Sequence, residues 1–149
     1  ERLKRFDEAE KAFREALALS PDAAIVQNYL GYMNADRNVK LDEALALIRK
    51  AVESEPDNGS YLDSLAWAYY RLGQHAQAEE AIRKAVTTQD KNAVVIAHMG
   101  FILAARGASE EALRYLKMAL TAEDEDGELD RALVENKIRS LSSSPAKNP

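Results

Sequence analysis

The sequence predicts an all-α protein made of stacked antiparallel helix pairs, and three observations carry this prediction. Apolar residues recur in register about every 34 residues along most of the chain. Inside each period the apolar spacing is i, i+3, i+4 and i+7, which is typical of amphipathic helices. Small residues recur at the places where two helices of a pair would meet. A fixed period of this length indicates a repeat architecture.

The recurrence joins three consecutive units and the segment before them. One set of positions is repeated as Ala44, Ile48 and Ala51, as Ala78, Ile82 and Ala85, and as Ala112, Leu116 and Ala119. A shift of 35 residues towards the N-terminus gives Ala9, Phe13 and Ala16. Gly73 and Gly107 lie 34 residues apart, where a turn between paired helices needs a left-handed residue.

Each complete unit is predicted to hold two helices. The expected pairs are residues 24–36 with 41–53, 60–72 with 75–87, and 93–105 with 109–121. Two unpaired helices are expected over residues 4–19 and 128–141. The first helix of each pair carries Gly31, Ala66 or Gly100, and we expect these residues to meet Ala44, Ala78 and Ala112 on the second helix. Larger side chains there would push the helix axes beyond the usual ~8–10 Å.

These units resemble the tetratricopeptide repeat, a 34-residue helix-turn-helix unit. The match runs through Leu65, Ala66, Tyr69, Gly73, Ala78, Ile82 and Ala85, and again through Gly100, Leu103, Gly107, Ala112, Leu116 and Ala119. The resemblance implies a right-handed α-solenoid of antiparallel helix pairs. About three complete repeats are expected, together with an N-terminal half repeat and a C-terminal capping helix.

The expected solenoid spans residues 1–142. It divides into a half repeat (1–22), three repeats (23–58, 59–92 and 93–126) and a capping helix (127–142), followed by an unstructured tail (143–149). The first complete repeat departs from the pattern by one extra residue within NADRNVK, between its helices. The half repeat keeps only its second helix.

The stretch YLDSLAWAYYRLG concentrates four aromatic residues on one predicted helix. In the family that the chain resembles, the first helix of each repeat lines the concave face. The concave positions include an aromatic residue in every complete repeat, and the ligand-contacting residues implied by the resemblance are Asn28, Tyr32, Asp63, Trp67, Tyr70 and Phe101. Tyr61 and Tyr69 fall on the other faces of their helix and are expected to pack within the fold.

Two interpretations of Tyr32, Trp67 and Phe101 stay open at the level of sequence. They could pack against neighbouring repeats, or they could form a row of contact residues along a groove, since large rigid rings are common interface anchors. The second interpretation predicts that Trp67→Ala weakens binding and leaves the fold intact. The family that the chain resembles is best known for a clamp of Lys, Asn and Arg that grips the C-terminal carboxylate of a peptide. This mode is excluded, because the Lys and Arg are missing here and Asp63 would repel a carboxylate. A ligand with a basic residue opposite Asp36 or Asp63 suits the groove better.

Composition and motifs argue against several other functions. The net charge of −5 disfavours nucleic acid, and no apolar stretch is long enough to insert into a membrane. The chain has no cysteine, and neither His75 nor His98 belongs to a catalytic or metal-binding pattern. The acidic run TAEDEDGELD lacks the ligand order of a calcium loop. We therefore predict no catalytic residue, no metal and no cofactor; an unrecognised hydrolase is a remote alternative.

The sequence favours a non-enzymatic scaffold that binds a peptide or protein segment on its concave face. LGYMNADRNVKLDEALALI and DNGSYLDSLAWAYYRLG are similar to C-terminal repeats of bacterial cell-envelope proteins, some of them attached to the outer membrane. That similarity implies that the chain is part of a longer bacterial adaptor. It favours a location of this protein in the periplasm or at the outer membrane, with the cytoplasm as the alternative. The chain begins inside a helical pattern, so we expect it to be a fragment.

Self-association is the competing hypothesis. The N-terminal helix carries Phe6, Phe13 and Leu17 without the first helix that should cover them. A bare apolar stripe favours association, so a homodimer could form through this half repeat.

Overall fold

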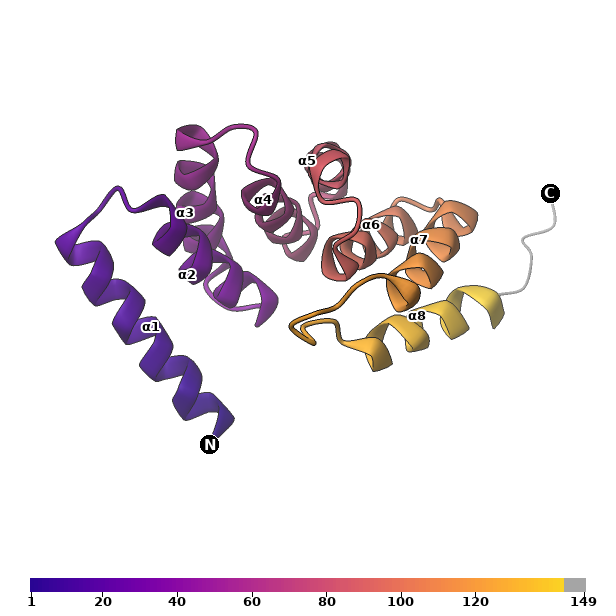
Figure 1. Ribbon diagram of the computed structural model, residues 1–149, viewed down its shortest axis with the longest axis horizontal. Coiled ribbons are helices and arrows are strands. Elements are labelled where there is room, and N and C mark those ends of the chain that lie inside the picture. The colour runs from indigo at the N-terminus through magenta and orange to yellow at the C-terminus, as the bar shows by residue number, and fades with distance from the viewer. Residues whose placement is uncertain (144–149) are drawn as a thin grey trace.

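The computed structural model describes residues 1–143 and shows a row of helices that follow one another in chain order (Figure 1). The helices are α1 (Arg2–Leu19), α2 (Ala24–Asp36), α3 (Leu41–Ser54), α4 (Gly59–Arg71), α5 (His75–Thr88), α6 (Ala93–Ala105), α7 (Ser109–Thr121) and α8 (Arg131–Ser143). Within this part of the chain there is no strand, and one isolated parallel bridge joins Asn92 to Glu123. The fold is an all-α repeat solenoid.

Three helix pairs form the repeats: α2 with α3, α4 with α5, and α6 with α7. Each pair also packs on the next, because α3 contacts α4 and α5 contacts α6, while α1 and α8 pack on the two end repeats. Backbone packing joins helices that are at most two apart along the chain. The arrangement is therefore a stack in which each repeat is stabilised by its immediate neighbours.

Small residues set the close contact inside the α2–α3 and α6–α7 pairs. A Cβ atom on Gly31 would lie 2.9 Å from the carbonyl oxygen of Ala44 and 2.6 Å from Cγ1 of Ile48. A Cβ atom on Gly100 would lie 2.6 Å from Cγ of Leu116. The expected small residues are thus at the contact, although the nearest neighbour of Gly100 is Leu116 and not Ala112.

The turns inside the pairs show where the repeats differ. Gly73 and Gly107 have φ angles of 77° and 84°, so glycine supplies the left-handed residue in the second and third pairs. The turn between α2 and α3 uses Asn38 and Lys40 instead, at φ 58° and 48°. The extra residue in the first complete repeat is accommodated in this turn.

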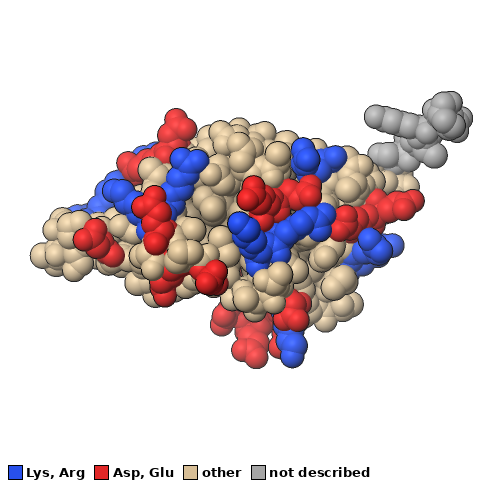
Figure 2. All heavy atoms as spheres, turned by 90° about the horizontal axis from the view of Figure 1, so that it is seen from above, with Lys and Arg blue, Asp and Glu red and all other residues tan. Residues whose placement is uncertain are grey.

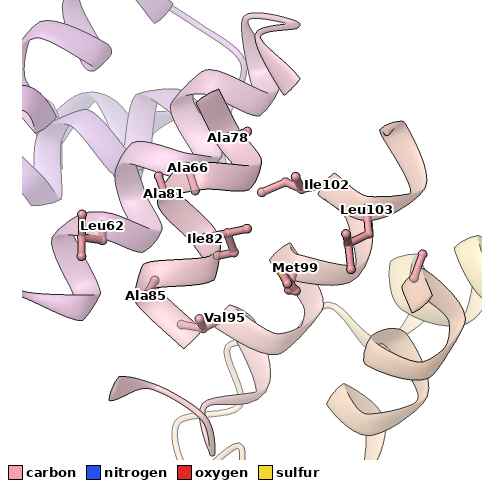
Figure 3. Packing of buried hydrophobic residues seen from close by; sticks show 11 residues of the cluster. Leu62, Ala66, Ala78, Ala81, Ile82, Ala85, Val95, Met99, Ile102 and Leu103 are labelled. Atoms are coloured by element: carbon pink, nitrogen blue, oxygen red, sulfur yellow. The ribbon is translucent and has the colours of Figure 1, made fainter. Parts of the chain in front are cut away.

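The hydrophobic core runs along the stack between the paired helices. One cluster, drawn in Figure 3, combines buried side chains of α4, α5 and α6 with Ala112 of α7. A second cluster joins Trp67, Ala97 and Phe101 to Leu129 and Val134 at the C-terminal end. The last helix therefore covers apolar side chains of the third repeat.

The capping helix begins at Arg131, three residues later than the sequence suggested, and ends at Ser143. Asp124 accepts hydrogen bonds from the backbone N–H groups of Glu128 and Leu129, and Asp130 accepts one from Leu133. These bonds stabilise the non-helical conformation of residues 122–130, which link α7 to α8. The linker runs back towards the middle of the molecule before α8 starts (Figure 1). Ser143, expected in the tail, belongs to α8; residues 144–149 lie outside the described residues.

Candidate functional site

The three rings predicted at equivalent positions meet at one hollow of the structure. Tyr32 comes from α2, Trp67 from α4 and Phe101 from α6. The hollow has a volume of about 260 Å³ and is closed on one side by the linker and the start of α8. Its other lining residues are Arg2, Asp36, Arg71, Val94, Ala97, His98, Glu128, Leu129, Asp130, Leu133 and Val134.

Trp67 is the centre of an aromatic stack and is only 3% exposed. Its ring lies between those of His98 and Tyr70, with centroid separations of 3.9 Å and 4.7 Å. The indole N–H donates a 3.1 Å hydrogen bond to Asp36, and the Arg71 guanidinium lies 5.0 Å from the ring. Of the two interpretations of Trp67, packing between repeats therefore describes its surroundings, and its removal would disturb the fold before it tested binding.

Phe101 and Tyr32 occupy the hollow in different ways. Phe101 is buried and meets Trp67 edge-on at 6.0 Å. Tyr32 is partly exposed, and its ring lies 6.2 Å from that of His98. Burial, together with the carboxylates of Asp36, Asp63 and Glu128, raises the pKa of the Tyr32 phenol well above its ordinary value. Tyr32 therefore stays a neutral hydroxyl that faces a negatively charged neighbourhood.

Asp63 and His98 form a buried pair that connects α4 with α6. Nδ1 of His98 donates to Oδ1 of Asp63 over 2.7 Å, and both side chains are almost fully covered. The carboxylate is already used inside the protein, so the basic ligand residue that the sequence suggested opposite Asp63 has no free partner there. Asp36, with a side chain that is 54% exposed, is the accessible carboxylate of the two.

Asn28 and Tyr70 lie away from this hollow. Asn28 is buried, and its Oδ1 atom has no hydrogen-bond partner among the described residues. Tyr70 faces a second hollow of about 300 Å³, which it shares with Trp67, Phe101 and Leu133 of α8. The structure therefore gathers Tyr32, Trp67, Tyr70 and Phe101 around two adjoining hollows, and it leaves Asn28 outside them.

The sequence interpretation missed the contribution of the linker and α8 to this surface. Glu128, Asp130 and Leu133 line the first hollow, although they lie outside the three complete repeats. Their partial signal was the apolar spacing of the capping helix, which indicated what it covers but not that it reaches the aromatic rings. The Asp63–His98 pair had a clearer signal, because the two residues are 35 positions apart on equivalent helices.

Within residues 1–143 no group of three His, Cys, Asp or Glu side chains is placed to hold a metal ion. In the acidic run, the side chains of Asp124 and Asp130 accept hydrogen bonds from backbone N–H groups. None of the described helices combines the length and the apolar character needed to cross a membrane.

The repeat pattern matches a known family model. The model described as tetratricopeptide repeat matches residues 1–59 and 35–94, which together make up more than half of the chain. The chain belongs to the tetratricopeptide repeat family. The fold is accordingly a protein–protein interaction module, and proteins of this kind are generally non-enzymatic scaffolds.

A curated relative gives a more specific similarity. The chain is 46% identical over 70 residues to the TPR repeat-containing protein PA4667 of Pseudomonas aeruginosa. This match covers 47% of the chain and 12% of the relative. The matched segment thus spans about an eighth of the length of that protein.

Solved structures agree on the fold. The thermophilic TPR protein TTC0263 of Thermus thermophilus matches with a TM-score of 0.76 at 21% identity, over 94% of this chain and 74% of that one. MamA AMB-1 matches with a TM-score of 0.62 at 27% identity, over 76% and 67%. The first TPR of Spaghetti (RPAP3), bound to an HSP90 peptide, matches with a TM-score of 0.65 at 24% identity, over 80% and 90%.

Proposed function

We propose that this TPR module binds a short peptide or protein segment in the two hollows beside Trp67, as one part of a longer bacterial adaptor. The observation that carries the proposal is the grouping of Tyr32, Tyr70, Phe101 and Leu133, from three repeat helices and the capping helix, around those hollows. Concave sites lined by aromatic rings with a few charged groups are typical ligand sites. A related module, the first TPR of Spaghetti (RPAP3), was solved with a bound peptide.

The charges around the first hollow define the segment further. Asp36, Glu128 and Asp130 line it, and Asp36 is the carboxylate of this group that makes an ion pair, with Arg71 at 3.8 Å. Glu128 has no ion-pair partner in the described structure and acts electrostatically on Tyr32. An apolar segment that carries one lysine or arginine complements this surface, because a cation is attracted both to the carboxylates and to the ring faces.

Selection from a displayed library of random 12-residue peptides tests the proposal. We expect the bound peptides to combine apolar side chains with lysine or arginine. Tyr32→Ala should weaken their binding about 10-fold or more, since aromatic anchors commonly dominate such interfaces. Glu128→Gln should weaken only the peptides that carry a basic residue. Isothermal titration calorimetry with synthetic peptides gives both comparisons.

Glu53→Ala on the exposed side of α3 is the control, and thermal melts of every variant verify that the fold is retained. Peptides that bind the Tyr32→Ala and Glu128→Gln variants as tightly as the native chain would refute the two hollows as the binding site.

Self-association is the second candidate, and the exposed apolar side chains of the N-terminal end favour it. Ile25 and Tyr29 of α2 are 54% and 53% exposed, and Leu19 at the end of α1 is 87% exposed. Phe13 of α1 stacks on Tyr29 at 6.1 Å, and the Arg37 guanidinium covers Phe6 at 4.4 Å. The exposed patch of this end is thus formed more by Leu19, Ile25 and Tyr29 than by Phe6, Phe13 and Leu17.

Multi-angle light scattering after gel filtration separates the two candidates. Self-association predicts a molar mass that rises towards that of a dimer with concentration, and Tyr29→Asp should abolish the rise. A constant monomer mass across the concentration range excludes this role for the chain.

A further inference from the structure

A groove of about 970 Å³ opens on the side of α4 opposite to Trp67. Its apolar floor is formed by α3, α4 and α5, and its rim is polar. The floor residues are Val52, Leu62, Leu65, Tyr69 and Ala81, and the rim residues include Asp57, Gln77, Glu80, Arg83, Lys84, Thr87 and Thr88. On a helix, residues 62, 65 and 69 share one face and residues 63, 67 and 70 another. The groove is therefore a surface separate from the proposed peptide site.

The next junction along the stack shows that this groove is not a general property of the repeat. Leu65 and Tyr69 on the floor are partly exposed. Their equivalents 34 residues later, Met99 and Leu103, are each only 1% exposed. The same helix face is thus fully covered between α5 and α7 and only partly covered between α3 and α5, where the Arg49 guanidinium lies 5.6 Å from the Tyr69 ring centroid.

A substitution between repeats contributes to this difference. Position 81 in α5 is alanine, whereas the equivalent residue of α7 is Tyr115, and that of α3 is Leu47. Tyr115 packs against the core cluster that includes Met99 and Leu103. Alanine at position 81 is too short to cover Leu65 and Tyr69 in the same way, so the floor of the groove stays open.

The junctions on either side are also closed by charged bridges. An arginine joins two glutamates in each: Arg14 with Glu10 and Glu43, and Arg83 with Glu79 and Glu111. The equivalent residues at the junction of α3 and α5 are Leu45, Arg49 and Gln77. Arg49 instead donates a 2.8 Å hydrogen bond to the Tyr69 hydroxyl. No equivalent bridge therefore crosses the open groove in the described structure.

We propose that this groove binds an aromatic side chain of a partner protein, with a lysine or arginine next to it in the partner. The aromatic assignment follows from Tyr115, because the chain itself uses a tyrosine to cover the equivalent floor one repeat later. The basic assignment follows from charge. Glu80, Arg83 and Lys84 on the rim all have ion-pair partners, whereas Asp57 has none among the described residues. A cation beside the ring would supply the missing partner for Asp57.

Nuclear magnetic resonance titration of the full ¹⁵N-labelled chain tests this site with N-acetyl-tyrosyl-lysinamide. We expect saturable shifts of the amides of Leu62, Leu65, Tyr69 and Ala81, with a dissociation constant of about 1 mM, as suits so small a ligand. N-acetyl-leucyl-lysinamide should bind several-fold more weakly. Shifts that do not saturate, or that lie outside the groove, would overturn the proposal.

Two variants copy the residues of the neighbouring junctions into the groove. Ala81→Tyr and Ala81→Leu should each abolish the shifts, because the new side chain fills the groove. The smaller leucine keeps the test valid if the Ala81→Tyr variant does not fold. Ala76→Tyr, on the exposed side of the same helix, is the matched control and should bind as the native chain does. Equal binding by native chain and Ala81→Leu would refute the site. Asp57→Asn should reduce the affinity for the tyrosyl-lysine probe to that for N-acetyl-tyrosinamide; no reduction would refute the basic residue.

Discussion

Asp63 and His98 illustrate how single residues connect neighbouring repeats. The pair is buried, joins α4 to α6 over 2.7 Å, and places the imidazole ring against Trp67. A buried carboxylate without its partner would keep its desolvation cost and lose its compensation. The pair therefore contributes less to net stability than its removal would suggest.

Breaking this pair has an expected signature. Asp63→Ala and His98→Ala should each lower the free energy of unfolding by about 3 kcal/mol, because each leaves the other group buried and unpaired. The double variant should lose less than the sum of the two, by ~1 kcal/mol or more. Urea denaturation followed by circular dichroism measures all three values. Strict additivity would show that the two side chains do not interact in solution.

Among the helices, charged bridges distinguish one junction from the next. Glu79 of α5 accepts hydrogen bonds from Arg83 of the same helix and from Arg106 at the end of α6. The hydrogen bond from Arg83, with that from Arg106, lowers the pKa of Glu79 below its ordinary value of 4.5. Figure 2 shows such acidic and basic side chains next to one another across the face that it presents.

This depressed pKa predicts a pH dependence of stability. Because the folded pKa lies below the unfolded one, the contribution of Glu79 is complete above about pH 4.5 and is lost as the pH falls through the folded pKa. Glu79→Gln should therefore lower the free energy of unfolding at neutral pH by up to ~1 kcal/mol, as is usual for exposed bridges. The difference should vanish in acid.

Thermal melts of both proteins between pH 7 and pH 3 measure the effect. Glu80→Gln is the control, since Glu80 is more exposed and its ion-pair partner within the described residues is Lys84 alone. A destabilisation by Glu79→Gln that persists unchanged at pH 3 would contradict the assignment.

The helix pairs could be predicted from the sequence because their signals are local and repeated. The turn glycines 73 and 107 and the paired small residues fix the phase of every repeat. The late start of α8 was not predicted, because it depends on side-chain bonds of Asp124 and Asp130 in a segment that occurs once. The positions of Tyr32, Trp67 and Phe101 beside one hollow followed from the repeat. The differences in burial among these three rings could not be predicted, since they depend on contacts with the linker and α8.

At the scale of the whole molecule, α8 closes one end of the stack. Val134 is 1% exposed and packs with Leu129 against the cluster that contains Phe101 and Leu116. The terminal repeat of a solenoid needs a cap of this kind because no further repeat covers its apolar face. The cap is therefore part of the fold as well as a wall of the proposed peptide site.

Removal of the cap should lower stability and solubility together. A chain that ends at Ala122 should lose ~3 kcal/mol or more of unfolding free energy, since two apolar side chains lose their buried positions. It should also associate through the uncovered face. Val134→Asp should act in the same direction, and Glu135→Ala, which is exposed, should be neutral. Urea denaturation and light scattering report the two effects; a truncated chain as stable as the native one would show that α8 is dispensable.

The restriction of backbone packing to helices at most two apart has a kinetic consequence. Native contacts form between segments that are close in sequence. The loops that these contacts close are therefore short, and little chain entropy is lost when the first folded helix pair forms. Low contact order of this kind is associated with folding in microseconds to milliseconds. Any one of the three repeats can start the process, and the order of assembly can change with a mutation while the final structure stays the same.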